Sequence, residues 1–166
     1  AIRRPDDVRA LVLAGSAGIR SATKRLRLAV TMVSLVRPAR YIAPHRARVA
    51  RSPLLRMLTF GHWGAADPLA LSDAAVDGFL VGPALHTDTL SAAKALVVED
   101  PREELELVRC PVLILWGARD NQLPMEDAFE YARRLRAPLR TIADCGHLLI
   151  GERPEACLDA IESFLG

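Results

Sequence analysis

CPVLILWGARD, residues 110–120, is the stretch that decides the fold. It contains five consecutive apolar residues, Val112 to Trp116, followed by a glycine and a charged turn. A short, continuous apolar run that ends in a turn is typical of a strand covered on both faces of a parallel sheet, since a half-exposed strand alternates between apolar and polar residues. The stretch therefore predicts a buried strand whose carboxyl end leads into a loop carrying Asp120.

Toward the C-terminus, the chain alternates between helix and strand patterns. PMEDAFEYARRLRA, residues 124–137, begins with a proline near two acids and ends with arginines, which is the charge order that a helix dipole favours. LRTIADCGH, residues 139–147, predicts a third short strand, and RPEACLDAIESFLG, residues 153–166, predicts a final helix with Pro154 near its first position. Strands and helices in alternation predict an α/β sheet.

Toward the N-terminus, VRALVLAGSAG, residues 8–18, contains an apolar run that ends in a glycine-rich turn. This run, Ala10 to Ala14, predicts another strand buried on both faces. The long segment that follows has a helical pattern. Its expected boundaries are breaks at Pro38, Pro44 and Pro53, an N-cap at Ser72 or Asp73, and a further helix over residues 85–98.

These patterns together predict an α/β fold, with a partial sheet of about three parallel strands, flanking helices and an inserted all-helical cap. We expect residues 1–20 to form a core strand and the entry to the cap, residues 21–106 the cap, and residues 107–166 the C-terminal core with the acid and histidine loops. Parallel sheets normally have more strands, covered by helices on both faces. The sequence therefore has the character of one part of a larger sheet.

The composition is that of a globular chain of 166 residues, 51% apolar and 25% charged, which is enough to bury a core. No apolar stretch reaches the roughly 20 residues that span a bilayer, and the opening AIRRPDDVRA has no apolar signal-peptide region, so we expect a cytoplasmic protein. The three cysteines, Cys110, Cys145 and Cys157, are odd in number and form no C-x-x-C pair. We expect them to be small core residues, and we expect no metal or cofactor.

Charge is distributed unevenly along the chain, although the net charge is only +2. Residues 20–56 contain ten lysines and arginines and no acid, whereas EDPREELE, residues 99–106, is strongly acidic. The basic run lacks interleaved aromatic residues and any nucleic-acid-binding motif, so solvated helix faces explain it better. We expect a small-molecule substrate, no nucleic acid and no membrane, and the oligomeric state is not predicted. The alternative is a non-catalytic module that binds an acidic partner or a membrane surface through this segment.

Asp120 and His147 are the candidate catalytic residues. Reactive groups of open α/β sheets gather beyond the carboxyl ends of the strands, and both residues follow predicted strands. A carboxylate that accepts the Nδ1 proton of His147 would fix its tautomer and stabilise the imidazolium that forms when Nε2 takes a proton from a nucleophile. Asp144 is the less favoured acid, because it falls within or at the end of the third strand. The plainer alternative is that Asp120 caps a turn and His147 packs beneath the last helix.

The remaining candidates are weaker. Ser16 in AGSAG is a candidate nucleophile with small neighbours on both sides, but IRSATKRLRL and a long helical insertion follow it, so a turn into the cap is the preferred interpretation. His45, His62 and His86 have no ligand-like spacing and are expected on the surface or in loops. His62 and Trp63 either line a pocket under the cap or belong to a loop anchored by the indole.

Three segments together resemble the α/β-hydrolases. PVLILWGARDNQLP is similar to the strand and acid loop of that family, CGHLLIGERPEACLDAIESFL to its histidine loop and last helix, and RRPDDVRALVLAGSAG to the segment that joins the helix after the nucleophile to the next strand. The resemblance covers residues 1–20 and 107–166, and the part between them matches only in being a helical lid. It implies a G-x-S-x-G elbow followed along the chain by the acid, Asp120, and then the base, His147.

The sequence itself contains no G-x-S-x-G. By the resemblance, the elbow lies roughly ten residues before Ala1, and the oxyanion-hole amides lie on it and on an earlier loop. The implied function is the C-terminal part of a serine-type hydrolase for a small apolar ester, lactone or related acyl substrate, inactive by itself. An aspartate nucleophile, as in dehalogenases and epoxide hydrolases, and acyl transfer to an acceptor other than water remain open.

Overall fold

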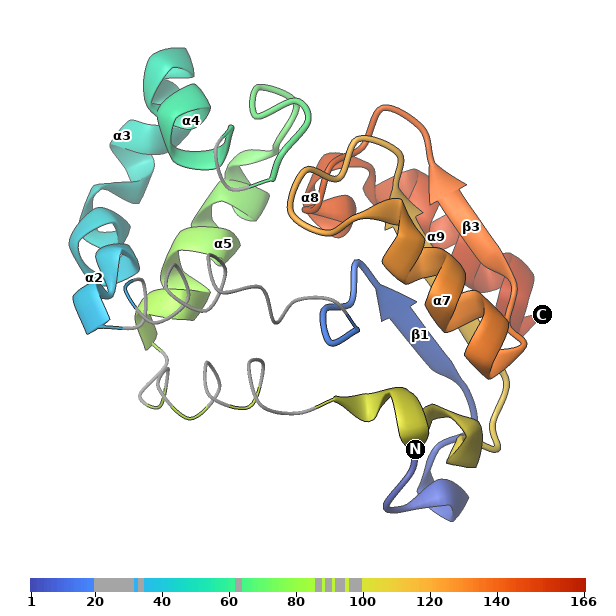
Figure 1. The fold of residues 1–166 in the computed structure, drawn as a ribbon. Helices are drawn as coiled ribbons and strands as arrows, with labels where there is room; N and C mark the ends of the chain where they lie inside the picture. Colours follow the sequence, from blue (N-terminus) through green and yellow to red (C-terminus); the bar gives the residue numbers. More distant parts are fainter. Residues whose placement is uncertain are drawn as a thin grey trace.

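The computed structural model describes residues 1–19, 32, 35–61, 64–85, 88, 91, 95 and 100–166. These residues contain a sheet of three parallel strands in the order β1 (Leu11–Ala14), β2 (Val112–Gly117) and β3 (Leu139–Ile142). Helices cover the sheet, and a separate group of helices lies beside it (Figure 1). The predicted α/β class and the small parallel sheet are confirmed.

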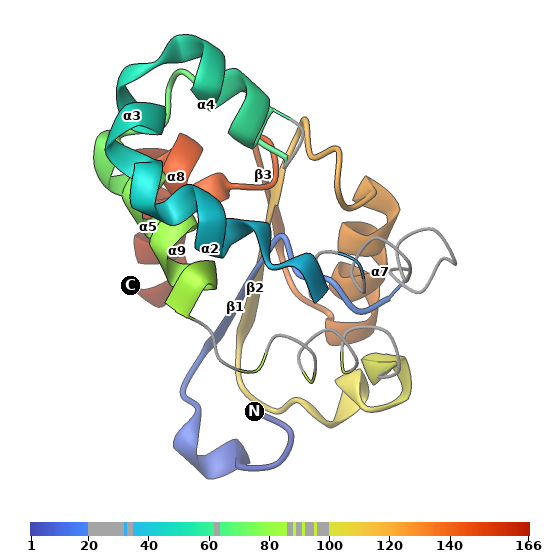
Figure 2. The same cartoon turned by 90° about the vertical axis from the view of Figure 1, so that its left-hand side faces the viewer.

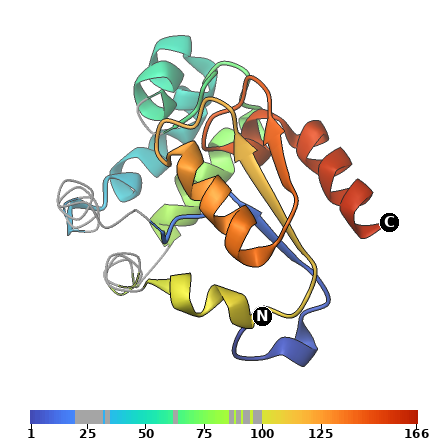
Figure 3. The same ribbon diagram turned by 45° about the vertical axis from the view of Figure 1, so that its right-hand side comes forward.

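The central strand β2 serves two hydrophobic cores, one on each face of the sheet. Ile114 packs with residues of α7 (Met125–Leu135). Its neighbour Leu113 points the other way and packs with residues of α9 (Pro154–Leu165). Figure 3 shows the two helices on opposite sides of the sheet. Successive side chains of a strand alternate between the two faces of the sheet, and both faces are covered here. Every residue of β2 is therefore buried, as predicted.

The first strand, β1, is less buried than predicted. Its residues are only partly covered, and Ala14 is exposed. The register pairs Leu11 with Val112 and Ala14 with Leu115, so β2 is the one partner of β1 in the described part of the chain. The prediction of a strand covered on both faces is therefore wrong for β1, because its position at the edge of this sheet cannot be read from a local apolar run.

The group of helices beside the sheet, residues 38–61 and 64–85, is called the helical layer below. Figure 2 shows it in front of the sheet. The prolines act as predicted, since proline suits the first position of a helix, and the Ser72 hydroxyl caps α5 by accepting the Ala75 N–H at 3.1 Å. In chain order its elements are α2 (Pro38–Ile42), the 3-10 turn η2 (Ala43–His45), α3 (Arg46–Arg51), α4 (Pro53–Phe60) and α5 (Asp73–Leu85).

The helical layer has a hydrophobic cluster of its own. Its buried members include Phe60, Leu71 and Val76. Leu148 packs against this cluster, whereas the next residue, Leu149, belongs to the cluster between the sheet and α9. Two successive residues that follow His147 thus reach into different cores.

Short helices complete the described chain: η1 (Pro5–Asp7), η3 (Pro101–Glu103), η4 (Leu105–Leu107) and α8 (Leu149–Glu152). All three cysteines are free; Cys145 and Cys157 are buried as predicted, but Cys110 is partly exposed. In the parts of the chain given above, no helix has the length and apolar character needed to cross a membrane. The helix predicted over residues 85–98 lies mostly outside the described residues.

Candidate active site

The structure brings Asp120 and His147 together at the carboxyl edge of the sheet. Asp120 follows β2 and His147 follows β3, as the sequence predicts. The imidazole Nδ1 lies 2.9 Å from Asp120 Oδ2. The Asp120 side chain is 1% exposed and the His147 side chain is 30% exposed, so the carboxyl is buried behind an imidazole that solvent can reach. The predicted contact between these two side chains is confirmed.

Asp120 uses both of its carboxylate oxygens. Oδ1 accepts the N–H groups of Gln122 at 2.8 Å and Leu123 at 2.9 Å, while Oδ2 faces His147. Burial of the carboxyl opposes its ionisation, but the hydrogen bonds from His147 and from the Leu123 and Gln122 amides outweigh burial and lower the pKa of Asp120 below its usual value. Capping the turn and orienting the histidine, which the sequence offers as alternatives, are therefore both properties of this residue.

Close backbone contacts hold the acid loop against the histidine loop. Arg119 donates its N–H to the Cys145 carbonyl at 2.8 Å. Gly117, the last residue of β2, lies directly under the histidine loop, where a Cβ would collide with the carbonyl groups of Cys145 and Gly146. A glycine after the apolar run therefore allows the two loops to cross at short range.

His147 is held from two further sides. Its backbone N–H donates to the Gly64 carbonyl at 2.6 Å. Gly64 has a φ of +100°, and a Cβ on it would lie 2.7 Å from the His147 Cβ. Gly15, in the turn after β1, faces the ring, since a Cβ there would lie 3.3 Å from Nδ1. The imidazole is thus packed between the turn after β1 and a loop of the helical layer, which restricts its orientation.

Glu152 is a residue of this site that the sequence analysis missed. Its side chain is buried, with the residue only 3% exposed. Its two oxygens accept four backbone N–H groups, those of Gly146, Leu148, Ala66 and Asp67. The available signal was a glutamate five residues after His147 and just before the Pro154 helix start. That signal does not show burial, which depends on the helical layer.

Two alternatives for the acid and the nucleophile are not supported by the geometry. Asp144 is exposed and forms an ion pair with Arg119 at 2.6 Å, whereas the carboxylate bonded to His147 is that of Asp120. It lies in the turn after β3 with a φ of +49°, and the strand ends earlier than predicted, at Ile142. Ser16 lies in the turn after β1, makes no hydrogen bond to His147 in the described structure, and is followed by non-helical residues 17–19.

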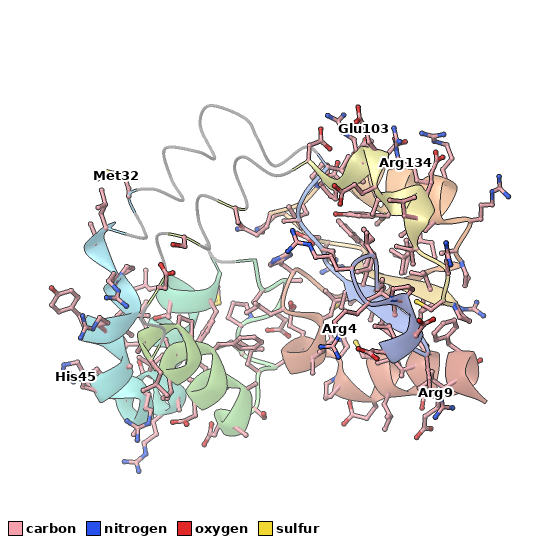
Figure 4. All side chains as sticks on the ribbon, turned by 90° about the horizontal axis from the view of Figure 1, so that it is seen from below. Arg4, Arg9, Met32, His45, Glu103 and Arg134 are labelled. Atoms are coloured by element: carbon pink, nitrogen blue, oxygen red, sulfur yellow. The ribbon has the colours of Figure 1, made fainter. Side chains whose placement is uncertain are left out.

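The other histidines do not join the pair. His45 is exposed and lies at the outer side of the helical layer, on the opposite side of the molecule from Arg9 (Figure 4). His62, Trp63 and His86 lie outside the described residues, so their predicted positions stay predictions. Within the residues that the structure describes, no group of three or more His, Cys, Asp or Glu side chains could hold a metal ion.

A groove of about 590 Å³ lies between α5 on one side and α8 with the start of α9 on the other. Its walls are largely apolar and include Ala75, Phe79 and Ile150. Neither Asp120 nor His147 lines it, whereas Glu152 does, so the groove borders the side chain that holds the histidine loop but not the Asp120–His147 pair itself.

The pair has the arrangement needed for general acid–base chemistry. A buried carboxylate bonded to Nδ1–H leaves Nε2 of a neutral imidazole as an acceptor. Such an imidazole can take a proton from a hydroxyl group and return it to a leaving group.

The fold and this pair define the class of protein. A sequence model of the family described as the alpha/beta hydrolase family matches residues 1–160. The chain therefore belongs to the alpha/beta hydrolase family, which confirms the resemblance seen in its acid and histidine loops. A comparison with curated proteins finds no match.

Solved structures of similar fold include three enzymes of this kind. The enol-lactonase from Burkholderia xenovorans has a TM-score of 0.65 and 19% identity, over 99% of this chain and 59% of that one. A thermophilic esterase from Thermogutta terrifontis has a TM-score of 0.62 and 20% identity, over 98% of this chain and 57% of the esterase chain. The 2-hydroxy-6-oxo-6-phenylhexa-2,4-dienoate hydrolase from a Rhodococcus species has a TM-score of 0.61 and 17% identity, over 99% and 57%. The similarity shows a common fold, and the chain spans only 51% to 60% of the length of such structures.

Proposed function

We propose that this chain supplies the acid and the base of a serine-type hydrolase. The observation that carries the proposal is the 2.9 Å contact between His147 Nδ1 and the buried Asp120 carboxylate. An anion in that position keeps the proton on Nδ1, leaves Nε2 free to accept another, and stabilises the imidazolium that results. Membership of the family supports the assignment, because a hydrolase of this fold places the acid and then the histidine after its nucleophile.

The proposed nucleophile is a serine on a strand-to-helix elbow outside the present chain, since solved structures of this fold are longer. Its oxygen attacks the substrate carbonyl while His147 Nε2 takes the hydroxyl proton, which then passes to the leaving alcohol as an acyl-serine forms. Water next attacks the acyl-serine, Nε2 takes a proton from the water, and that proton returns to the serine as the acid leaves. Asp120 stays ionised and orients the ring throughout.

The proposed substrate is a small, largely apolar ester, lactone or related acyl compound. An enol-lactonase and an esterase are among the proteins of similar fold. Leu54, Met57 and Leu58 of α4 are 68%, 49% and 57% exposed. Their spacing places them on one side of the helix, so the helical layer has an exposed apolar surface.

Hydrolysis of p-nitrophenyl acetate and butyrate tests this proposal, with residues 1–166 and with a longer protein that includes the upstream elbow. We expect no turnover by the 166-residue chain alone, because the nucleophile and oxyanion hole supply most of the rate enhancement. In the longer protein, Asp120→Asn should lower kcat/KM by about 10³- to 10⁴-fold, since an asparagine N–H facing Nδ1 favours the wrong tautomer. Asp144→Asn, the exposed control, should change it by less than about twofold.

Several outcomes would contradict the proposal. One is turnover by the 166-residue chain that Ser16→Ala abolishes. Another is full activity of Asp120→Asn in the longer protein. A fluorophosphonate separates the two kinds of nucleophile, because a serine reacts with it and an aspartate does not. An active enzyme that resists labelling would indicate an aspartate nucleophile.

The binding-module alternative receives little support from the basic segment. Arg46 pairs with Asp77, and Arg56 pairs with Asp73 and donates to the Leu71 carbonyl. These contacts tie α3 and α4 to α5, so part of the basic charge has a structural use. Salt-sensitive binding to DNA or anionic vesicles, surviving replacement of both members of the acid–base pair, would favour the module instead.

A further inference from the structure

We propose that Glu152 is a positioning residue that fastens the His147 loop to the helical layer, so that the proposed base and the helical layer move as one unit. The inference rests on the proposed role of His147 as the base and names what holds that base in place. Glu152 is the last residue of α8 and is 3% exposed. It acts through the backbone on either side of the histidine.

The Glu152 carboxyl divides its two oxygens between two segments of the chain. Oε1 accepts the N–H groups of Gly146 at 3.1 Å and Leu148 at 3.3 Å, the residues that flank the base. Oε2 accepts those of Ala66 at 2.7 Å and Asp67 at 3.2 Å, in the loop between α4 and α5. One buried side chain therefore satisfies four backbone donors that belong to two different parts of the fold.

Further contacts cross the same junction. His147 donates its N–H to the Gly64 carbonyl at 2.6 Å, and Leu148 packs against the cluster of the helical layer. A Cβ on Gly146 would collide with the Gly64 carbonyl and lie 2.6 Å from the Ala66 nitrogen. The two loops thus lie backbone against backbone, and a shift of one loop must move the other.

The chemistry of the junction requires a side chain with two acceptor atoms, one for each loop. Four N–H groups converge on it, and a carboxylate offers two oxygens that only accept. Glutamine has the same size but carries an NH₂ donor in place of one oxygen, so one of the two loops would meet a donor instead of an acceptor. The packing would remain while one attachment is lost. Because the histidine loop would then be less firmly held, the 2.9 Å contact between His147 and Asp120 should lengthen. A shift of about 1 Å is enough to weaken such a pair.

Native-state hydrogen exchange of the unmodified chain, followed by NMR, tests the attachment. Since they share one acceptor side chain, the N–H groups of Gly146, Leu148, Ala66 and Asp67 should show similar protection and open together. Fast exchange at Ala66 and Asp67, with strong protection at the other two, would overturn the proposal, because the helical layer would then not be attached through this residue.

Glu152→Gln tests the effect on the base, with Glu155→Gln at an exposed position of α9 as the matched control. The measurement is the exchange rate of the low-field Nδ1 proton of His147, which reports opening of the Asp120–His147 pair and does not depend on turnover. Glu152→Gln should raise this rate by about tenfold or more while most backbone resonances stay in place, and the control should leave it unchanged. An unchanged rate in a folded Glu152→Gln protein would overturn the proposal. If that variant unfolds, the exchange pattern of the unmodified chain decides.

These readouts separate the role of Glu152 from the proposed function, because neither needs turnover. Shared protection of the four N–H groups together with an inactive longer protein would refute the hydrolase and retain the positioning role. If the longer protein is active, and Glu152→Gln changes neither its kcat/KM nor the exchange rate of the His147 Nδ1 proton, the positioning role is refuted and the hydrolase is retained.

Discussion

At the scale of single residues, the site depends on buried carboxyl groups that accept backbone N–H groups. Asp120 gives one oxygen to the amides of Gln122 and Leu123 and the other to His147. Glu152 gives both of its oxygens to backbone donors. In both cases hydrogen bonds from fixed donors offset the cost of burial, so each carboxyl has a single favoured orientation.

Asp120 should make the stability of the fold depend on pH. Burial opposes its ionisation, but hydrogen bonds from His147 and the Leu123 and Gln122 amides lower its pKa, so the unfolded chain binds the proton more readily than the folded one. Its contribution is fully present above the ordinary aspartate pKa of about 3.9 and is lost as the pH falls through that value and then through the lower pKa of the folded state. We expect the wild type to exceed Asp120→Asn in free energy of unfolding by about 1–3 kcal/mol near neutral pH, and this difference to shrink below about pH 4.

Urea unfolding at a series of pH values measures this difference. Asp144→Asn is the control, because its ion pair with Arg119 is exposed and should contribute less than about 0.5 kcal/mol at any pH. A stability difference for Asp120→Asn that stays constant from neutral pH to about pH 3 would contradict a lowered pKa for Asp120.

At the scale of elements, one glycine at a strand end and one in a loop of the helical layer allow the segments of the site to meet. Gly117 is the last residue of β2 and lies beneath the histidine loop. Gly64 lies in the loop between α4 and α5 and contacts His147. Neither contact is compatible with a side chain, since an added Cβ at either position meets the histidine loop or its side chain at less than van der Waals distance.

Gly64→Ala should lower the free energy of unfolding by about 1–3 kcal/mol. Its φ of +100° is unfavourable for alanine, and the added Cβ would lie 2.7 Å from the His147 Cβ and 2.8 Å from the Gln122 Cγ. The same change at Gly78, inside α5 with no heavy atom within 4 Å of the added Cβ, should instead stabilise the protein by about 0.5–1 kcal/mol. Urea unfolding of the two variants gives both values, and effects of the same sign would contradict this account.

Element boundaries were predicted well where a local signal exists. Pro53 and Pro154 begin helices and Ser72 caps one, because a fixed φ and a short hydroxyl act on their own turn. The third strand ends at Ile142, before the predicted end, because Asp144 takes a left-handed conformation. That conformation is favoured by the surrounding turn and its contacts, which the pattern of residues does not show.

At the scale of the whole molecule, the histidine loop is the place where two cores meet. Leu148 packs against the cluster of the helical layer, and Leu149, 3% exposed, packs between the sheet and α9. His147 is therefore anchored by both cores, and loosening either one should disturb it.

Leu149→Ala should lower the free energy of unfolding by about 2–4 kcal/mol, because it removes apolar contacts and leaves a cavity in a packed core. Leu158→Ala is the matched control in α9, where the side chain is 53% exposed, and should cost less than about 0.5 kcal/mol. Urea unfolding monitored by circular dichroism measures both. A cost below about 1 kcal/mol for Leu149→Ala would show that this loop is not anchored in the core between the sheet and α9.

The sequence by itself determined the class of fold and placed Asp120 and His147 after successive strands as candidates for the acid and the base. These depend on signals within a few residues: the apolar run of β2, the turn that follows it, and a histidine placed between a strand and a helix start. Only the tertiary structure decided that Asp120 and not Asp144 faces the base, that β1 lies at an edge, and that Glu152 is buried. Burial and orientation are set by contacts between distant segments, such as the bond from Ala66 to a residue 86 positions later, and no local pattern of residues encodes such a contact.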